Sequence, residues 1–211
     1  MLENIEVLCH SSVKIKKEKV IYIDPFNIEK NYNDADIIFI THNHYDHYSK
    51  EDIKKVKKEN TVFVATKDVV DELLKDGINQ DKIKIVYPNN SYMLDKINFE
   101  TIPAYNINKQ FHPKENGWVG YILEIEGVKY YIAGDTDITE ENQKVKCDIA
   151  FIPVGGTYTM DFKEAAELVN EIRPKIAVPT HYGSIVGAKQ DGVEFVKLLK
   201  PEIKGEILMN K

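Results

Sequence analysis

The chain has 211 residues, a formal net charge of −6 at pH 7, and 43% hydrophobic and 29% charged residues. This composition is ordinary for a globular protein and argues against a long disordered tail. The acidic balance, with Arg173 as the lone arginine, argues against a nucleic-acid substrate, because such sites usually present a basic face with arginines that bind in a bidentate manner.

Three short strands are predicted near the N-terminus, where β-branched and other apolar residues alternate with turns. They span Ile5–Leu8, Val13–Ile15 and Val20–Ile23. Asp24-Pro25 ends the third strand, because the residue before a proline is restricted and the chain must leave the ladder there. His10 lies at the end of the first strand, where two readings stay open, a side chain that lines a pocket or an ordinary polar residue of a turn.

The fourth strand carries the strongest chemical signal. Ile37–Ile40 is an apolar run that predicts a strand buried on both faces, and His42, His44, Asp46 and His47 follow it directly. His42 and His44 are two apart, so an extended chain points both side chains to one side. Asp46 and His47 can return from the following turn. Imidazoles beside a carboxylate suit zinc, manganese or Fe(II) better than calcium or magnesium, so a metal site is predicted here.

Helices and strands alternate in the next segment. Ser49, followed three residues later by an acidic residue, is an N-cap pattern for a Lys-rich helix that runs to Lys58. Thr61–Ala65 predicts a strand, and the apolar stripe over 69–74 predicts a helix that ends at Gly77. This alternation indicates α/β layering.

A second sheet is predicted from further strands in the rest of the chain. They span Ile83–Val86, Ser91–Leu94, Ile97–Ile102, Gly120–Ile125 and Val128–Ala133. Gly127 lies at the turn of the hairpin between the last two. Asp161 caps a helix that ends before Pro174, and a last helix over Val193–Lys200 precedes a terminal strand around Glu206–Leu208.

A weak internal repeat connects the two halves of the chain. Ile21–Asp24 followed by Asp36–Ile40 is echoed by Tyr131–Asp135 followed by Asp148–Ile152. Two similar β-rich halves that pack face to face would bury both sheets and leave the helices outside. The repeat therefore predicts an α+β fold of the αββα sandwich type, with two mixed β-sheets and helices on both outer sides.

Two later strand ends also carry residues of the ligand type. Asp135 follows a buried strand and Gly134, which lets the backbone approach closely. His181 ends the strand Ile176–Thr180 and repeats the Thr-His ending of the fourth strand. Both residues are candidates for the same metal site.

The motif His42-x-His44-x-Asp46-His47 after a buried strand resembles the metal motif of the metallo-β-lactamase superfamily, and it matches without a gap. The resemblance covers nearly the whole chain and is specific around the ligands. It implies the αββα sandwich independently of the repeat.

The resemblance also implies roles for the other candidates. Asp135 would bridge two metal ions, and His181 would be the last ligand of the second ion. His10, in a His-Ser pair such as this family often carries near its N-terminus, would line the pocket rather than bind metal. The implied cofactors are two divalent ions, with zinc expected and manganese or iron as alternatives.

One family position departs from the pattern. The metal histidine usually found between the first motif and the bridging Asp is replaced by Asn106, and the only histidine of this region is His112. Asn106, a neutral oxygen donor, would be a poor zinc ligand and is expected at the substrate. Either the loop folds back so that His112 supplies the missing nitrogen, or the first ion is held loosely by His42, His44 and Asp135.

The implied chemistry is hydrolysis by metal-bound hydroxide. Two cations about 3.5–4 Å apart would lower the pKa of a shared water toward neutrality. Asp46 and Asp135 would orient the hydroxide as catalytic groups, and the ions would take up charge on the attacked oxygen. Tyr158, after the paired glycines 155–156, is a candidate to touch the substrate or to donate a proton to the leaving group.

The resemblance is strongest to small members near the ascorbate-phosphate lactonases and the phospholipase D-type phosphodiesterases. A metal-dependent hydrolase of a small ester-like bond, lactone or phosphodiester, is therefore expected. The alternative is a degenerate metal-binding protein without turnover, because the middle ligand is replaced at Asn106. Redox chemistry at two irons is a third hypothesis, and it would need a flavin partner.

The remaining expectations concern organisation. We expect one domain over residues 1–211, a small-molecule substrate and no nucleic-acid partner, and the sequence does not predict an oligomeric state. No apolar run reaches the length of a bilayer span and Met1–Asn4 lack the basic start of a signal peptide, so a cytoplasmic protein without stable membrane association is expected. Cys9 and Cys147 are expected to be reduced.

Overall fold

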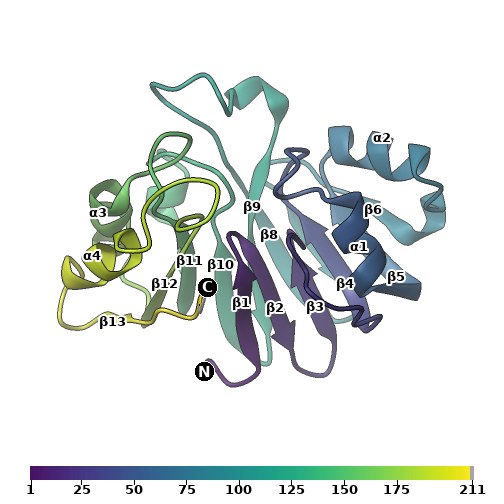
Figure 1. Ribbon diagram of the computed structural model, residues 1–211, viewed down its shortest axis with the longest axis horizontal. Helices are drawn as coiled ribbons and strands as arrows, with labels where there is room; N and C mark the ends of the chain where they lie inside the picture. The colour runs from purple at the N-terminus through teal and green to yellow at the C-terminus, as the bar shows by residue number, and fades with distance from the viewer. Residues whose placement is uncertain (210–211) are drawn as a thin grey trace. The chain divides into compact units, whose positions relative to one another are not determined.

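The computed structural model describes residues 1–209, which divide into two compact units. Unit 1 comprises residues 1–87 and Met209, and unit 2 comprises residues 88–208. Each unit contains one β-sheet with its own helices (Figure 1). The single domain expected from the length stays a prediction.

The sheet of unit 1 has six strands in sequential order. They are β1 (Ile5–Cys9), β2 (Ser12–Lys16), β3 (Val20–Ile23), β4 (Ala35–Ile40), β5 (Lys57–Ala65) and β6 (Ile83–Ile85). The pairs β1–β2 and β2–β3 are antiparallel, and the pairs from β3 to β6 are parallel. The helices are α1 (Lys50–Val56) and α2 (Lys67–Lys75), with a 3-10 turn at Gln80–Lys82.

The core of unit 1 lies between its sheet and its two helices. Ile38 and Ile40 of β4 alternate toward this side, where they join Phe63 of β5, Ile53 of α1 and Val69 of α2 in one buried cluster. All four residues of Ile37–Ile40 are fully buried. The strand predicted to be buried on both faces is therefore confirmed, and its rigid end presents the histidine motif.

The Asp52 side chain connects the first turn of α1 to the segment after β3 by hydrogen bonds. Its carboxylate accepts hydrogen bonds from the backbone N–H groups of Asn27 and Ile28 at 2.8 and 2.9 Å, from the Ser49 hydroxyl and from the Lys55 ammonium. Burial alone would raise the pKa of this carboxyl, but the four donors outweigh burial and lower it.

Replacing Asp52 by asparagine should destabilise the protein by about 1–3 kcal/mol at pH 7, because buried donors lose a charged acceptor. A lowered pKa adds stability that is present above the unfolded-state pKa of about 4 and is lost as the pH falls through the folded-state pKa. Urea unfolding should therefore show that the difference in free energy of unfolding between wild type and Asp52→Asn becomes smaller from pH 7 to pH 3. The exposed Asp81→Asn variant is the control, and a difference that stays constant with pH would contradict this account.

The sheet of unit 2 has seven strands in the order β13-β12-β11-β10-β9-β8-β7. They are β7 (Ser91–Leu94), β8 (Ile97–Pro103), β9 (Val119–Ile125), β10 (Val128–Ile132), β11 (Ile149–Pro153), β12 (Ile176–Thr180) and β13 (Lys204–Gly205). The helices are α3 (Phe162–Ile172), which packs against β11, and α4 (Asp191–Lys197), which packs against β12 and α3. Short 3-10 turns lie at Lys114–Asn116 and Asn142–Lys144. The capping box predicted from Asp161 is present, with Glu164 as its partner.

The two sheets repeat one topology. Two antiparallel pairs followed by three parallel pairs run from β1 to β6, and the same sequence of directions runs from β8 to β13. Asp36 accepts a hydrogen bond from the N–H of Val20, and Asp148 accepts one from the N–H of Lys129, each across the equivalent parallel pair. The weak repeat in the sequence is therefore a structural repeat. The N–H of Asp24 donates to Phe39 as the N–H of Ala133 donates to Phe151, so Asp135 lies two residues beyond the position equivalent to Asp24.

Some predicted boundaries were wrong. The segment 83–86 was assigned to the second sheet, but β6 pairs with β5 in the first. The helix expected to reach Lys58 ends at Val56, because Lys57 already enters β5. The last helix spans 191–197 instead of 193–200, and the terminal strand lies at 204–205 instead of 206–208. Short elements with mixed polarity leave such ends undetermined by local pattern.

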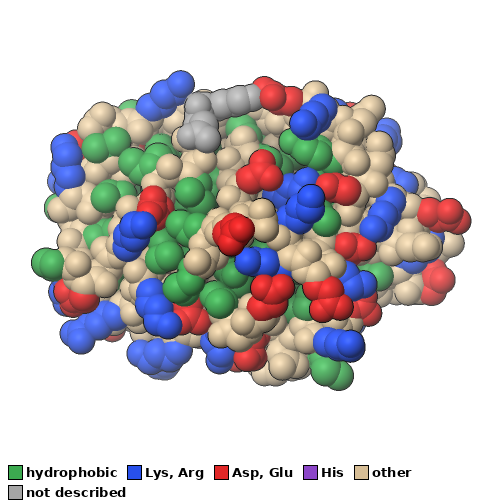
Figure 2. Space-filling model, turned by 90° about the horizontal axis from the view of Figure 1, so that it is seen from below, with side chains coloured by type: hydrophobic (Ala, Val, Ile, Leu, Met, Phe, Trp, Pro, Cys, Tyr) green, Lys and Arg blue, Asp and Glu red, His purple; other side chains and the backbone are tan. Residues whose placement is uncertain are grey.

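The surface charges, the two cysteines and the lengths of the helices also bear on the predictions. Lysines and acidic side chains are interspersed on the face drawn in Figure 2, as expected for a chain without a strongly basic character. Both cysteines are free, and burial raises the pKa of the Cys147 thiol to about 12. Within residues 1–209 the longest helix has 11 residues, well short of the roughly 20 that a bilayer crossing requires.

Candidate functional site

The predicted ligands of unit 1 lie in one tight turn after β4. The carbonyl of His44 accepts hydrogen bonds from the N–H groups of His47 and Tyr48, so the chain reverses within the motif. His42 and His47 are almost fully buried, Asp46 is buried and His44 is half-buried. The local sequence therefore folds as expected, with Asp46 and His47 returned toward the strand end.

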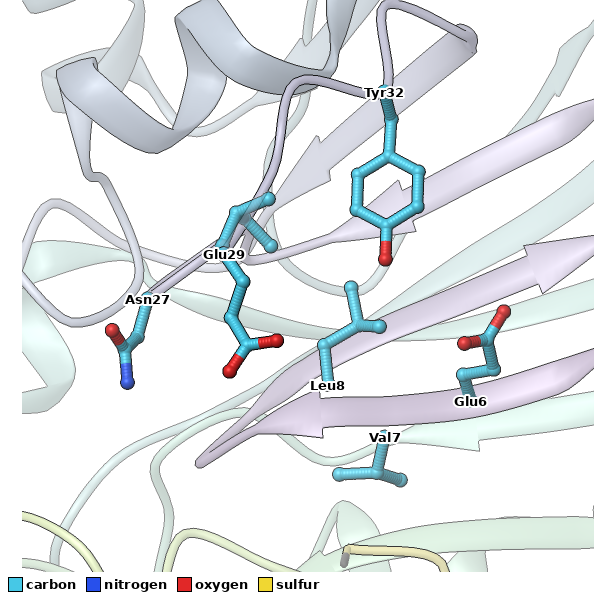
Figure 3. A pocket seen from close by; sticks show the side chains of 7 residues that line it. Glu6, Val7, Leu8, Asn27, Glu29 and Tyr32 are labelled. Carbon is cyan, nitrogen blue, oxygen red and sulfur yellow. The ribbon is translucent and has the colours of Figure 1, made fainter. Parts of the chain in front are cut away.

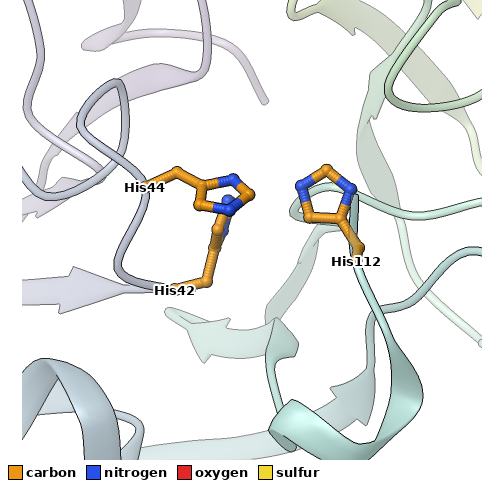
Figure 4. Close-up of side chains that lie close together, drawn as sticks. All are labelled: His42, His44 and His112. Carbon is orange, nitrogen blue, oxygen red and sulfur yellow. The ribbon is translucent and has the colours of Figure 1, made fainter. Parts of the chain in front are cut away.

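Three imidazoles of unit 1 gather at this strand end. The ring centroids of His42 and His44 lie 4.6 Å apart at 75°, and those of His42 and His47 lie 4.0 Å apart. One nitrogen of His42 and one of His44 lie within 4.8 Å of each other, which is a separation that one cation can span (Figure 4). The alternate-residue spacing brings both side chains to the same side, as predicted.

Asp24 organises these histidines, and the sequence analysis did not include it in the site. Its fully buried carboxylate accepts the N–H of Thr41 at 2.8 Å, the Thr41 hydroxyl at 2.7 Å and Nδ1–H of His47 at 2.8 Å. The signal that could have found it is the internal repeat of the sequence, in which Asp24 and Asp135 each follow one of the two similar strands.

These hydrogen bonds determine which ring nitrogens carry protons. A carboxylate only accepts, so Nδ1 of His47 must donate to Asp24. The Thr41 hydroxyl already donates to Asp24, so it accepts from Nδ1 of His42 at 2.9 Å. In their neutral forms His42 and His47 therefore both keep an electron pair on Nε2, the form in which imidazole binds a metal.

His10 lies beside Asp46 at the turn between β1 and β2. Its Nε2 is 3.2 Å from Oδ2 of Asp46, and the side chain is fully buried. The backbone of His10 has a φ of 54°, a left-handed conformation that is uncommon for a residue with a side chain. The structure thus places His10 next to a predicted ligand, and its role as a pocket-lining residue stays a prediction.

The predicted ligands of unit 2 meet at Asp135, which follows β10. Oδ2 of Asp135 lies 3.0 Å from Nε2 of His181 and 3.3 Å from Nε2 of His112. All three side chains are buried, with exposed fractions of 3% or less. Three segments far apart in the sequence, the ends of β10 and β12 and the loop before β9, therefore converge on one carboxylate.

The loop from Asn106 to His112 folds back, as the first of the two alternatives requires, and the role of His112 as a metal ligand stays a prediction. The N–H of Asn106 donates to the carbonyl of His112 at 2.8 Å, and Oδ1 of Asn106 accepts the His112 N–H at 3.0 Å. Nδ1 of His112 lies 3.1 Å from the same Oδ1. Asn106 holds His112 at both its backbone and its ring (Figure 4 draws the His112 ring).

The Asn106 contacts also define the tautomer of His112. Nδ2 of Asn106 donates to the carbonyl of Tyr158 at 2.9 Å, so its Oδ1 must be the atom that faces His112. Nδ1 of His112 is therefore protonated, and in a neutral ring Nε2 carries the electron pair that faces Asp135. Two electron-pair donors at 3.3 Å attract each other only through a cation or a proton between them.

Asp137 holds the other end of this loop. Its carboxylate accepts the side-chain amide of Asn106 at 3.2 Å, the N–H of Ile107 at 3.0 Å and the ammonium of Lys109 at 2.6 Å. The chain of contacts from Asp137 through Asn106 to His112 is buried at all three side chains. Asp137 and Asn106 act as positioning residues, a role that the sequence analysis did not assign.

His181 depends on a glycine for its position. A Cβ built on Gly155 would lie 2.2 Å from the carbonyl oxygen of His181, so no other residue fits there. His181 itself has a φ of 56°. The first of the paired glycines after β11 therefore makes room for the backbone of a predicted ligand.

The donor sets of both units fit a borderline divalent cation. Unit 1 offers the imidazoles of His42, His44 and His47 with the carboxylate of Asp46, and unit 2 offers two imidazoles with one carboxylate. Neutral imidazole and carboxylate are the ligands of zinc, manganese and iron, and the Nδ1 hydrogen bonds orient the rings as outer-shell partners do in metal sites.

A separate cavity of about 190 Å³ lies in unit 1. It is bounded by β1 and the segment after β3, and Glu6, Leu8, Glu29 and Tyr32 are among its walls (Figure 3). None of the predicted site residues lines this cavity. The cavity is therefore distinct from the predicted site.

Sequence comparison adds an independent result. A model of the β-lactamase superfamily domain matches residues 4–181. A UPF0173 metal-dependent hydrolase from Methanosphaera stadtmanae is 31% identical, over 95% of this chain and 93% of that protein. A protein of the same description from Thermococcus onnurineus is 29% identical, over 98% and 96%.

Solved structures give the same result for the fold. A candidate metal-dependent hydrolase from Parabacteroides distasonis superposes with a TM-score of 0.83 at 31% identity, over 98% of this chain and 93% of that chain. Igni18, a metallo hydrolase from Ignicoccus hospitalis, has a TM-score of 0.80 at 22% identity, over 97% and 94%. The predicted fold class, an α+β sandwich with two mixed sheets, is confirmed.

Proposed function

The chain belongs to the β-lactamase superfamily and is related to its metal-dependent hydrolases, and we propose that it hydrolyses a small ester-like bond with the help of two divalent ions. The observation that carries the proposal is the orientation of the buried histidines. His42, His47 and His112 each engage Nδ1–H in a hydrogen bond, so each offers Nε2 as a metal ligand.

We assign the metal-binding roles to seven residues of the chain. They are His42, His44, Asp46, His47, His112, Asp135 and His181. Zinc is the expected ion, with manganese or iron as alternatives, since imidazole and carboxylate suit all three. When bound, such ions lower the pKa of water and stabilise negative charge on the attacked oxygen.

The protein residues would contribute positioning and proton handling. Asp46 and Asp135 would orient the attacking water, because each is a buried carboxylate that can accept a hydrogen bond from it. His10, 3.2 Å from Asp46, would hold that carboxylate in place. Tyr158 is the candidate to touch the substrate, since its carbonyl is held by Asn106 next to His112.

The expected substrates are lactones or phosphodiesters of small metabolites. The relatives described as metal-dependent hydrolases support hydrolysis as the reaction class. The hypothesis of a chain without turnover depended on the replacement at Asn106. Because His112 returns to Asp135 and Asn106 supports it, this replacement no longer favours that hypothesis.

The proposal is tested by assaying the protein loaded with zinc, manganese or iron against three probe classes. These are γ-butyrolactone, p-nitrophenyl acetate and bis(p-nitrophenyl) phosphate. Turnover of at least one class that is lost with a chelator and restored by the ion would support it. Tight binding of metal with no turnover of any probe under any ion would overturn it.

Replacing His112 by alanine should reduce the tightly held metal from about two ions to about one per chain, because one imidazole nitrogen is lost from a site of few protein ligands. Elemental analysis after gel filtration measures this ratio. The exposed Glu115→Ala, three residues away, is the matched control and should keep the wild-type ratio. An unchanged ratio with tight retention in His112→Ala would remove this residue from the ligands.

A further inference from the structure

We propose that Phe111 and Tyr158 form an apolar wall beside His112 that binds an alkyl or aryl group of the substrate. This inference rests on the proposed function and adds the substrate class, an ester or lactone with an apolar substituent. The two rings pack edge to face, with centroids 4.6 Å apart and an interplanar angle of 89°. Phe111 nevertheless keeps 46% of its surface exposed.

The wall is joined to the predicted ligand by covalent and hydrogen bonds. Phe111 directly precedes His112 in the chain. The side-chain amide of Asn106 donates to the carbonyl of Tyr158, and its oxygen accepts from His112. The same asparagine therefore positions both the wall and the imidazole, so a group bound on the wall would lie at a defined distance from the reacting bond.

The loop that carries Phe111 presents apolar side chains, while the ammonium of its lysine, Lys109, is already bound to a carboxylate. Ile107 is 55% exposed, although its backbone N–H is held by Asp137. The ammonium of Lys109 also binds Asp137, at 2.6 Å. Exposed apolar side chains gathered beside a predicted site mark a ligand-binding surface, and this one would recognise hydrocarbon rather than an anionic group.

The ligand turn of unit 1 shows the same pattern independently. Tyr45 lies between His44 and Asp46 and is 66% exposed. Its ring packs edge to face against Phe26, with centroids 6.1 Å apart. The turn after β4 and the loop before β9 thus each hold one exposed aromatic ring next to a predicted ligand.

The test uses straight-chain carboxylates, from acetate through butyrate to hexanoate, as probes that bind without turnover. Their dissociation constants for the zinc-loaded protein are measured by NMR titration. Full burial of a methylene gives about fourfold tighter binding, so a chain lying against one wall should gain about twofold per methylene. In Phe111→Ala an added methylene should hardly change the dissociation constant, while in Phe111→Leu it should still tighten binding almost as much as in wild type.

Leu198→Ala is the matched control, because Leu198 has the same exposed fraction of 46% but lies at the end of α4. Its dissociation constants should follow those of wild type. Metal content measured in Phe111→Ala shows whether His112 still binds normally. The proposal of an apolar wall would be overturned if each methylene tightened binding in Phe111→Ala as much as in wild type. It would also be overturned if methylenes did not tighten binding in wild type. If the wild-type protein turned over none of the hydrolysis probes but still bound longer carboxylates more tightly, the result would count against the proposed function alone.

Discussion

Asp135→Asn is expected to lower kcat/KM for any hydrolysed probe by about a thousandfold or more, while the protein stays folded. The substitution keeps the shape of the side chain and removes its negative charge. In the structure Oδ2 of Asp135 is approached by both His112 and His181, at 3.3 and 3.0 Å. A carboxylate that organises metal-assisted hydrolysis contributes to several kcal/mol of transition-state stabilisation, and about 4 kcal/mol corresponds to three orders of magnitude.

The measurement combines steady-state kinetics with thermal unfolding and metal content. Asp95→Asn is the matched control, because Asp95 lies at a turn of the same unit with a φ of 46° that asparagine also tolerates. Its kinetics should equal those of wild type. If Asp135→Asn kept its activity within tenfold while binding metal normally, Asp135 would have neither a catalytic nor a ligand role.

Asp24→Ala is expected to lower the free energy of unfolding by about 3 kcal/mol or more. Three buried donors, the N–H and the hydroxyl of Thr41 and Nδ1–H of His47, lose their common acceptor, and each orphaned group costs about 1–3 kcal/mol. The tautomers of His42 and His47 also lose their support. Metal affinity should therefore fall by about 10–100-fold, as for other outer-shell partners.

Urea unfolding of chelator-treated protein separates the two effects. The loss of stability should remain when no metal is bound, because the hydrogen bonds to Asp24 belong to the fold itself. Asp36→Ala, which removes a carboxylate that accepts the N–H of Val20 and the ammonium of the exposed Lys58 side chain, is the comparison and should lose about 1 kcal/mol. If chelator-treated Asp24→Ala were as stable as wild type, Asp24 would act only through the metal.

The structural repeat places Asp24 and Asp135 after equivalent strands, with Asp135 two residues further along, and the two carboxylates have different partners. Each follows the first of the parallel strands in its sheet, β3 or β10. Asp24 accepts hydrogen bonds from Thr41 and His47, so it supports predicted ligands. Asp135 lies against the Nε2 atoms of His112 and His181, the nitrogens proposed to bind metal. The segments after two equivalent strands thus provide a supporting carboxylate in one unit and a candidate ligand in the other.

Asn106 has a physical role that its residue type did not reveal. An asparagine offers an acceptor and two donors, and here they connect His112, Asp137 and the carbonyl of Tyr158. A histidine at this position could not make all of these contacts. The departure from the family pattern is therefore accompanied by a loop that brings another histidine, His112, to Asp135.

The sequence by itself determined most strands, the helix caps and the metal motif of unit 1. These depend on neighbours within a few residues: the apolar run Ile37–Ile40 buries both faces, Ser49 and Asp161 cap the helices that follow them, and His42 and His44 share a side because they are two apart. Local period and capping chemistry act over the same short range, so a linear pattern is sufficient to predict them.

Only the tertiary structure decided which distant groups meet. β6 joins the first sheet, Asp24 reaches His47 across 23 positions, and His112 folds back to Asp135 through Asn106. Contacts of this kind depend on how the strands are ordered and where the loops close. No residue's neighbours along the chain encode that order, because the free energy that selects it comes from burial and hydrogen bonding between segments far apart in sequence.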